Sequence, residues 1–353
     1  MKYLKPYNKF SLNEAVGVAE ATLIYNDFIL GKFEEYLNEF LESGESDSTK
    51  GRTYTEQDLS EIINNTLWPK MPISSILLEF TFKKMSDDDF KKKYPVTSKI
   101  KNYNGLGACY PITNEESPEV SYVKGPINDR SDKTIHLRLE IGAVISDVFT
   151  DMEGLLLETE SSITHELNHA YEGWMRLKSG AGIISTDVTW GLDENRARIR
   201  KDIWKYWTDR ISTYIYWAER HEINAMTQEC WPYVKKYDVE KMKEVAPSWR
   251  YANDMTKFKA DTFKSELSKM IKDAYPEADP EIMISRMKNG FANKLIKMRQ
   301  ESIKLKENAP SIKGENILRM SVDEFLKFSE VRINSAGEKL KRRILKLYSL
   351  KVK

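Results

Sequence analysis

Residues 162–172 read Ser-Ile-Thr-His-Glu-Leu-Asn-His-Ala-Tyr-Glu, and the rest of the chain can be understood from this stretch. It places His165 and His169 four positions apart, with Glu166 directly after the first histidine. On an α-helix, residues at i and i+4 lie one turn apart on the same face. The two imidazoles can therefore bind one Zn²⁺, and the carboxylate of Glu166 can accept a proton from a water molecule beside the metal.

The residues around this motif have the period of an amphipathic helix. Their apolar side chains recur every three or four positions and form one stripe: Ile163, Leu167, Ala170, Trp174 and Leu177. At about 100° per residue, the two histidines point away from this stripe. The sequence predicts a helix over about 158–178 that packs through one face and presents both histidines on another. The alternative is an amphipathic helix with two solvated histidines.

The motif resembles the zincin superfamily of zinc metallopeptidases. The resemblance implies that His165 and His169 are zinc ligands and that Glu166 is the catalytic base. The metzincin subfamily has Gly three residues and His six residues after the second histidine, where this chain has Glu172 and Met175. The resemblance is therefore to the gluzincin type, in which a glutamate from a later helix is the third ligand.

Two later glutamates are candidates for that third ligand. Glu222 lies in the segment Glu-Ile-Asn-Ala (222–225), which resembles the third-ligand helix of several bacterial and phage-type zincins, and we expect this helix over about 215–230. Glu194 is the alternative, either as a ligand or as an acid that orients a metal-bound histidine. The neighbouring His221 would point about 100° away from Glu222. It is a candidate for stabilising a transition-state oxyanion, or it is satisfied by local contacts.

Hydrophobic patterning predicts an α+β, mostly helical fold, and the resemblance to zincins implies a zincin-like core. Alternating residues predict a small antiparallel or mixed sheet within about 73–142, upstream of the motif helix. The segment Thr134–Ile141 is expected either as an edge strand, to which a substrate backbone could add, or as an ordinary core strand. Helices are expected at 11–42, 254–274, 280–306 and 322–350. We divide the chain into a metallopeptidase domain, 1–240, and a helical C-terminal region, 241–353.

Composition restricts the class of protein. The 353 residues are 41% hydrophobic and 31% charged, which is typical of a globular protein with a sizeable core. The net charge of +1 produces no overall field that favours nucleic acid. The two cysteines, Cys109 and Cys230, form no disulfide framework and lack the spacing of zinc ligands. We find no secretory signal and no apolar run of transmembrane length, so a cytoplasmic or virion-associated location is expected.

The C-terminal helix carries a strong local charge. Residues 339–353 contain seven basic and no acidic side chains, while Leu340, Ile344 and Leu347 form an apolar stripe. This pattern predicts a basic amphipathic helix, whose partner would be nucleic acid, an anionic surface or an acidic protein. The alternative is a helix docked on its own protein with a solvated basic face.

Taken together, these features predict a zinc-dependent peptidase that cleaves peptide or protein substrates. His165, His169 and Glu222 would hold Zn²⁺, and Glu166 would be the general base. The alternative is a non-enzymatic structural or binding protein that retains a zincin fold. Residues 1–10 resemble the start of some tailed-phage virion proteins, so such a protein, or the peptidase itself, would be part of a phage particle.

Overall fold

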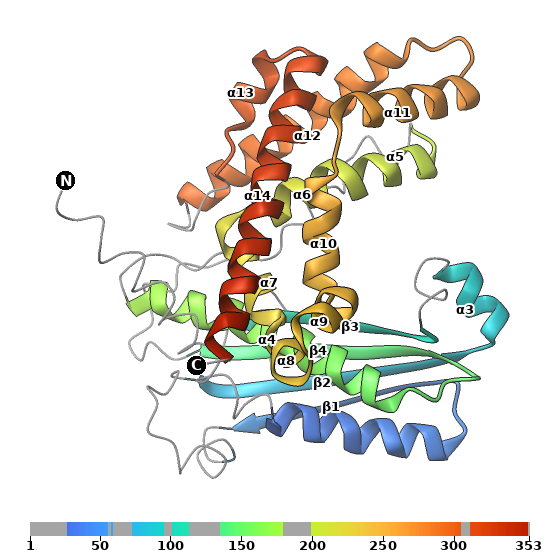
Figure 1. Ribbon diagram of the computed structural model, residues 1–353, viewed down its shortest axis with the longest axis vertical. Coiled ribbons are helices and arrows are strands. Elements are labelled where there is room, and N and C mark those ends of the chain that lie inside the picture. Colours follow the sequence, from blue (N-terminus) through green and yellow to red (C-terminus); the bar gives the residue numbers. More distant parts are fainter. Residues whose placement is uncertain are drawn as a thin grey trace. The chain divides into compact units, whose positions relative to one another are not determined.

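The computed structural model describes residues 27–55, 58, 73–94, 101–112, 135–178, 199–304 and 311–351. Most of these residues are helical, and a small mixed sheet accompanies the helices (Figure 1), which confirms the α+β, mostly helical class. Contacts group the chain into two compact units, Met1–Gly180 with Gln228–Asp238 and Ala181–Thr227 with Val239–Lys353. The domain boundary expected at 240 stays a prediction. None of the helices in the described ranges is long and apolar enough to span a membrane.

The first unit contains a four-stranded mixed sheet with the order β1-β2-β4-β3. The strands are β1 (Asp47–Thr55), β2 (Ile73–Met85), β3 (Tyr103–Ile112) and β4 (Ile135–Ser146). β2 and β4 run parallel, whereas the pairs β1–β2 and β3–β4 are antiparallel. The sheet was expected within 73–142, and β1 lies outside that range. Its sequence, Asp-Ser-Thr-Lys-Gly-Arg-Thr-Tyr-Thr, has few apolar residues, and Tyr54 is its buried one.

The strand expected at Thr134–Ile141 is β4. Of its two alternatives, the ordinary core strand is confirmed and the edge strand is wrong. β4 lies between β2 and β3 and pairs with both. Its residues Ala143, Val144 and Ile145 are buried in succession, which is typical of a strand covered on both faces. The edge on this side of the described sheet is β3, which includes Pro111. Proline lacks a backbone donor and is tolerated on edge strands.

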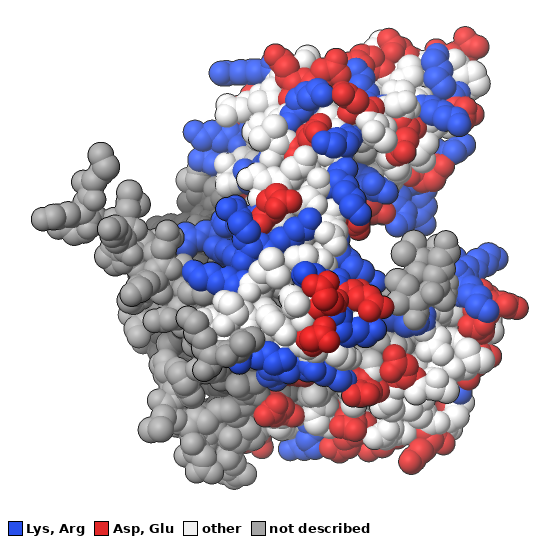
Figure 2. Space-filling view, in the orientation of Figure 1, with Lys and Arg blue, Asp and Glu red and all other residues white. Residues whose placement is uncertain are grey.

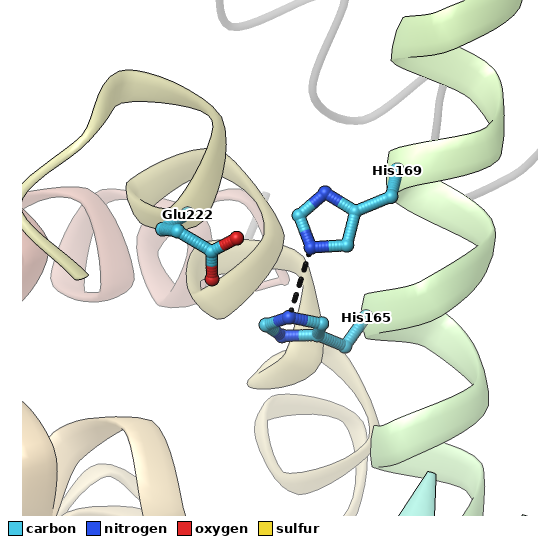
Figure 3. Close-up of side chains that lie close together, drawn as sticks. All are labelled: His165, His169 and Glu222. Atoms are coloured by element: carbon cyan, nitrogen blue, oxygen red, sulfur yellow. Dashed lines mark hydrogen bonds between the residues drawn. The ribbon is translucent and has the colours of Figure 1, made fainter. Parts of the chain in front are cut away.

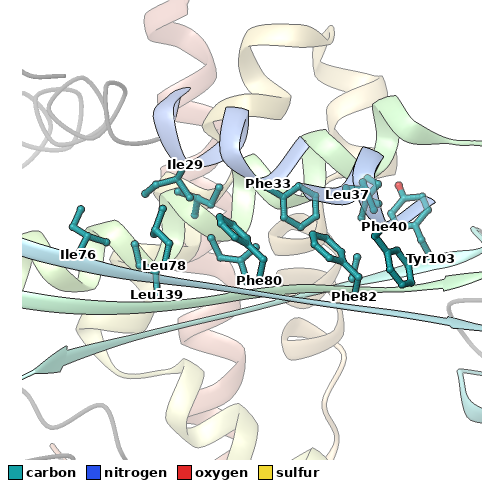
Figure 4. Close-up of a cluster of buried hydrophobic side chains, with 14 of the residues drawn as sticks. Ile29, Phe33, Leu37, Phe40, Ile76, Leu78, Phe80, Phe82, Tyr103 and Leu139 are labelled. Carbon is teal, nitrogen blue, oxygen red and sulfur yellow. The ribbon is translucent and has the colours of Figure 1, made fainter. Parts of the chain in front are cut away.

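One face of this sheet carries the core of the first unit. Residues 27–43 form a helix, and its buried side chains recur every three or four positions: Ile29, Phe33, Leu37 and Phe40. They pack on alternate residues of β2, which are Ile76, Leu78, Phe80 and Phe82 (Figure 4). The rings of Phe33 and Phe82 lie 5.3 Å apart between centroids. Residues 11–26 of the helix expected at 11–42 lie outside the described residues.

The motif helix, α4 (Met152–Lys178), packs into the same core. Its buried residues Ile163 and Leu167 belong to the predicted apolar stripe. The carboxylate of Glu158 accepts hydrogen bonds from Lys101 and from the backbone N–H of Gly105 on β3. These contacts fasten α4 to the sheet beside its edge strand. The first unit also contains two shorter helices, α3 (Asp87–Lys93) and α8 (Trp231–Lys236).

The described part of the second unit is helical. It comprises α5 (Lys201–Trp207), a π-helical turn (Thr208–Ser212), α6 (Thr213–Trp217), α7 (Arg220–Glu229), α9 (Val239–Val245), α10 (Pro247–Thr256), α11 (Ala260–Ala274), α12 (Pro280–Lys304), α13 (Gly314–Arg319) and α14 (Val322–Lys351). The helix expected at 215–230 corresponds to α7, a continuous helix whose last two residues group with the first unit. α14 packs along α10.

Candidate metal centre

His165 and His169 project from the same face of α4, as their spacing predicts (Figure 3). Their Nε2 atoms lie 3.1 Å apart and their ring centroids 4.8 Å apart. Both side chains are half-buried. Because Ile163 and Leu167 anchor the opposite side of the helix in the core, the histidines are held on a fixed face rather than on a mobile loop.

Glu229 determines the orientation of the first imidazole. Its Oε2 lies 3.0 Å from Nδ1 of His165, so Nδ1 carries a proton and donates it to the carboxylate. The lone pair of His165 is then on Nε2, the atom that faces His169. The hydroxyl of Ser161 also donates to the main-chain oxygen of Glu229 at 2.8 Å. A carboxylate in this position is the common partner of a histidine that binds a metal through its other nitrogen.

Glu222 adds a third candidate ligand. Candidate ligand atoms of His165, His169 and Glu222 all lie within 4.8 Å of one another, and Figure 3 shows the carboxylate facing the two rings. Glu222 and Glu229 are seven residues apart on α7, so two helical turns bring them to the same face. The helix that orients His165 therefore also presents Glu222. The Glu222 side chain is only 2% exposed, and carboxylates buried to this extent are held by polar partners or by a metal.

The separations of these candidate ligand atoms allow a metal ion such as zinc to bind after a small side-chain movement. With metal–nitrogen bonds of about 2.0–2.1 Å and tetrahedral angles, two ligand atoms are about 3.3 Å apart. The two Nε2 atoms already have nearly this separation, and the carboxylate reaches it by a side-chain shift of at most about 1.5 Å. Two imidazoles and one carboxylate are the donor set of catalytic zinc sites, which leave a fourth position open.

The other candidate residues differ in their placement. Glu166 is half-buried and is not among the three converging ligand residues. Nε2 of His221 lies 3.4 Å from Oε1 of Glu222, and its ring meets that of Tyr216 edge-on. His221 thus lies against the ligand carboxylate. Glu194 lies outside the described residues. Cys230 is buried and belongs to no ligand cluster among the described residues.

Glu229 is the site residue that the sequence analysis missed. Its contact with His165 spans 64 positions, so no local pattern around the motif points to it. The available signal was the spacing of seven residues from Glu222, which places a second carboxylate on the face of the expected third ligand.

Comparison with known proteins finds no significant match for this chain among family models, curated proteins or solved structures.

Proposed function

We propose that this protein is a zinc-dependent peptidase with a zincin-like core. The observation that supports this most strongly is the convergence of His165, His169 and Glu222, with Glu166 next to the first ligand. Zinc in this position would polarise the substrate carbonyl and lower the pKa of a water molecule. The donor set alone does not distinguish amides from other hydrolysable bonds.

Each residue has a role that follows from its position. Glu166 takes a proton from the attacking water and later delivers it to the leaving amine. Glu229 keeps the proton of His165 on Nδ1, so that Nε2 always presents a lone pair to the metal. His221 lies beside the Glu222 carboxylate and is the candidate donor to a developing oxyanion.

The edge strand β3 supports a peptide as substrate. Among the described strands β3 pairs only with β4, so its outer edge offers backbone donors and acceptors. An extended peptide can add to such an edge, and its main-chain hydrogen bonds would hold it regardless of sequence. Since Glu158 fastens β3 to the motif helix, a peptide on this edge would run beside α4.

The Glu166→Gln variant tests the proposal. Gln has the same shape but cannot take a proton, so we expect peptide hydrolysis to fall by about 10²–10⁴-fold while one zinc stays bound. Hydrolysis of fluorogenic peptides is measured for the zinc-loaded protein, with Glu153→Gln on the exposed first turn of the same helix as control. A Glu166→Gln protein as active as the wild type would refute the mechanism. A wild-type protein that binds zinc but cleaves no peptide would favour the non-enzymatic alternative.

A further inference from the structure

A cluster of cations lies on the C-terminal half of α14. Lys339, Arg342, Arg343 and Lys346 follow the spacing i, i+3, i+4 and i+7, which places them along one side of the helix. Lys and Arg side chains gather over this part of α14 in Figure 2. Arg220, the first residue of α7, also lies near Lys339. Burial lowers the pKa of Lys339, and the neighbouring charges of Arg343, Arg220 and Arg342 lower it further.

The apolar side of this helix is already occupied. Leu340, Ile344 and Leu347 are at most 2% exposed, and α14 packs along α10. A helix that binds a membrane must lay its apolar face into the lipid. Because the protein itself covers this face of α14, the basic side is what the helix offers to a partner.

Arg220 and three cations of α14 are not neutralised by the protein. Within the described residues, no carboxylate lies at ion-pair distance from Arg220, Lys339, Arg342 or Lys346. Arg342 donates to the main-chain oxygen of Glu338, which leaves its charge in place. Neighbouring positive charges repel one another, and an anion bound between them would relieve this repulsion. A guanidinium also matches the planar carboxylate with two parallel hydrogen bonds.

The cluster shares a helix with the third metal ligand. Arg220 and Asn224 lie two residues before and after Glu222 on α7, and both project from the other side of that helix. Lys339 lies near Arg220, and Arg343 donates a hydrogen bond to Asn224. Given the length of an arginine side chain, these two cations lie about 10–15 Å from the Glu222 carboxylate. An extended peptide advances about 3.3 Å per residue, so this distance corresponds to roughly three to five residues.

We propose that Arg220, Lys339, Arg342 and Arg343 form a subsite for the acidic side chains of a peptide substrate. This inference rests on the proposed function. It implies that the enzyme prefers peptides that carry Asp or Glu about three to five residues from the scissile bond. Asn224 contributes by positioning the guanidinium of Arg343, since its amide oxygen accepts a hydrogen bond from Nη1.

The test compares two fluorogenic peptides that differ only in having Glu or Gln at these positions. For the zinc-loaded full chain, we expect kcat/KM to be at least about tenfold higher for the Glu peptide, with a preference that weakens as salt increases. The double variant Lys339→Gln/Arg342→Gln should lose this preference. Lys327→Gln, on the same helix but paired with Asp261 at 3.0 Å, should keep it. An unchanged preference in the double variant would overturn the proposal.

Binding measurements separate this subsite from the proposed activity. Fluorescence anisotropy of the labelled Glu peptide is measured on wild type, on the double variant and on Arg220→Gln, which changes an exposed residue and so leaves the fold intact. If no peptide is cleaved but binding is lost in these variants, the subsite stands and the peptidase proposal fails. If a single-stranded oligonucleotide displaces the peptide and binds more tightly with increasing length, the cluster is a nucleic-acid surface and the acidic-peptide proposal is wrong.

Discussion

Glu229 is not a candidate ligand itself, but the proposed zinc geometry depends on it because it orients His165. Glu229→Gln keeps the shape and an oxygen that accepts from Nδ1 of His165, but it removes the charge that strengthens this hydrogen bond. We expect zinc affinity to fall by about 10–100-fold, as measured by competition with a chromophoric chelator. Glu240→Gln removes an exposed carboxylate and should leave the affinity unchanged. Equal affinities of the wild type and the Glu229→Gln variant would show that Glu229 does not orient the ligand.

Lys288 provides a prediction of pH dependence. Its side chain is buried, and its ammonium donates to the main-chain oxygens of Ile317 and Met320 at the end of α13. Burial lowers its pKa in the folded protein below the value of about 10.4 in the unfolded chain. Between these two values the unfolded chain holds more protons, so the free energy of unfolding rises with pH.

The difference in the free energy of unfolding between wild type and Lys288→Met isolates the contribution of Lys288. All other titrating groups are present in both proteins, so their contributions cancel. Urea unfolding at several pH values up to about 10.4 measures it. We expect the wild type to gain stability relative to the Lys288→Met variant as the pH rises. A difference that shrinks with increasing pH would contradict the assigned effect of burial.

The residues of the metal centre differ in how far the sequence predicts them. The spacing of His165 and His169 places them together because one helical turn is a local geometry. Glu222 was proposed from a resemblance, and the structure brings its carboxylate to the two histidines. Glu229 was not predicted, because its contacts with Ser161 and His165 join residues that are far apart in the sequence.

At the scale of elements, the packing of α14 on α10 depends on a residue without a side chain. A Cβ at Gly337 would lie 2.8 Å from the main-chain oxygen of Ala252 and 2.9 Å from Cβ of Met255. Gly337→Ala should therefore destabilise the protein by about 1–3 kcal/mol, although Ala is the better helix former. Gly31, inside the helix 27–43, has no neighbour within 4 Å of such a Cβ, and Gly31→Ala should stabilise by about 0.5–1 kcal/mol. Thermal unfolding measures both, and a stabilising effect of Gly337→Ala would show that these helices tolerate a wider separation.

The order of strands lay beyond what the sequence could predict. Alternation identified β2 and the first half of β4, because a strand with one buried face repeats every two residues, whereas residues 141–146 are buried in succession. It did not show that β3 would lie outside β4, because pairing depends on residues that are distant in sequence. β1 has too few apolar residues for a strand signal, and it is held by its pairing with β2. The helix expected at 254–274 corresponds to α11, which begins at Ala260, and the first three of the expected residues are the end of α10.

At the scale of the whole molecule, the candidate metal centre combines residues that are distant in the sequence. α4 carries two imidazoles on a half-buried face, and α7 carries a candidate ligand carboxylate and an orienting carboxylate two turns apart. The sequence between these helices includes Glu194, so the third ligand can be assigned only by changing each glutamate in turn.

The most direct test is the zinc content of the purified full-length chain, measured by elemental mass spectrometry for wild type, His165→Ala and Glu222→Ala. The proposal predicts about one zinc per wild-type chain and its loss from both variants, with folding of each verified by circular dichroism. A Glu222→Ala protein that keeps its zinc would move the third ligand to another residue. A wild-type chain that holds no zinc even after supplementation would contradict the metal centre itself.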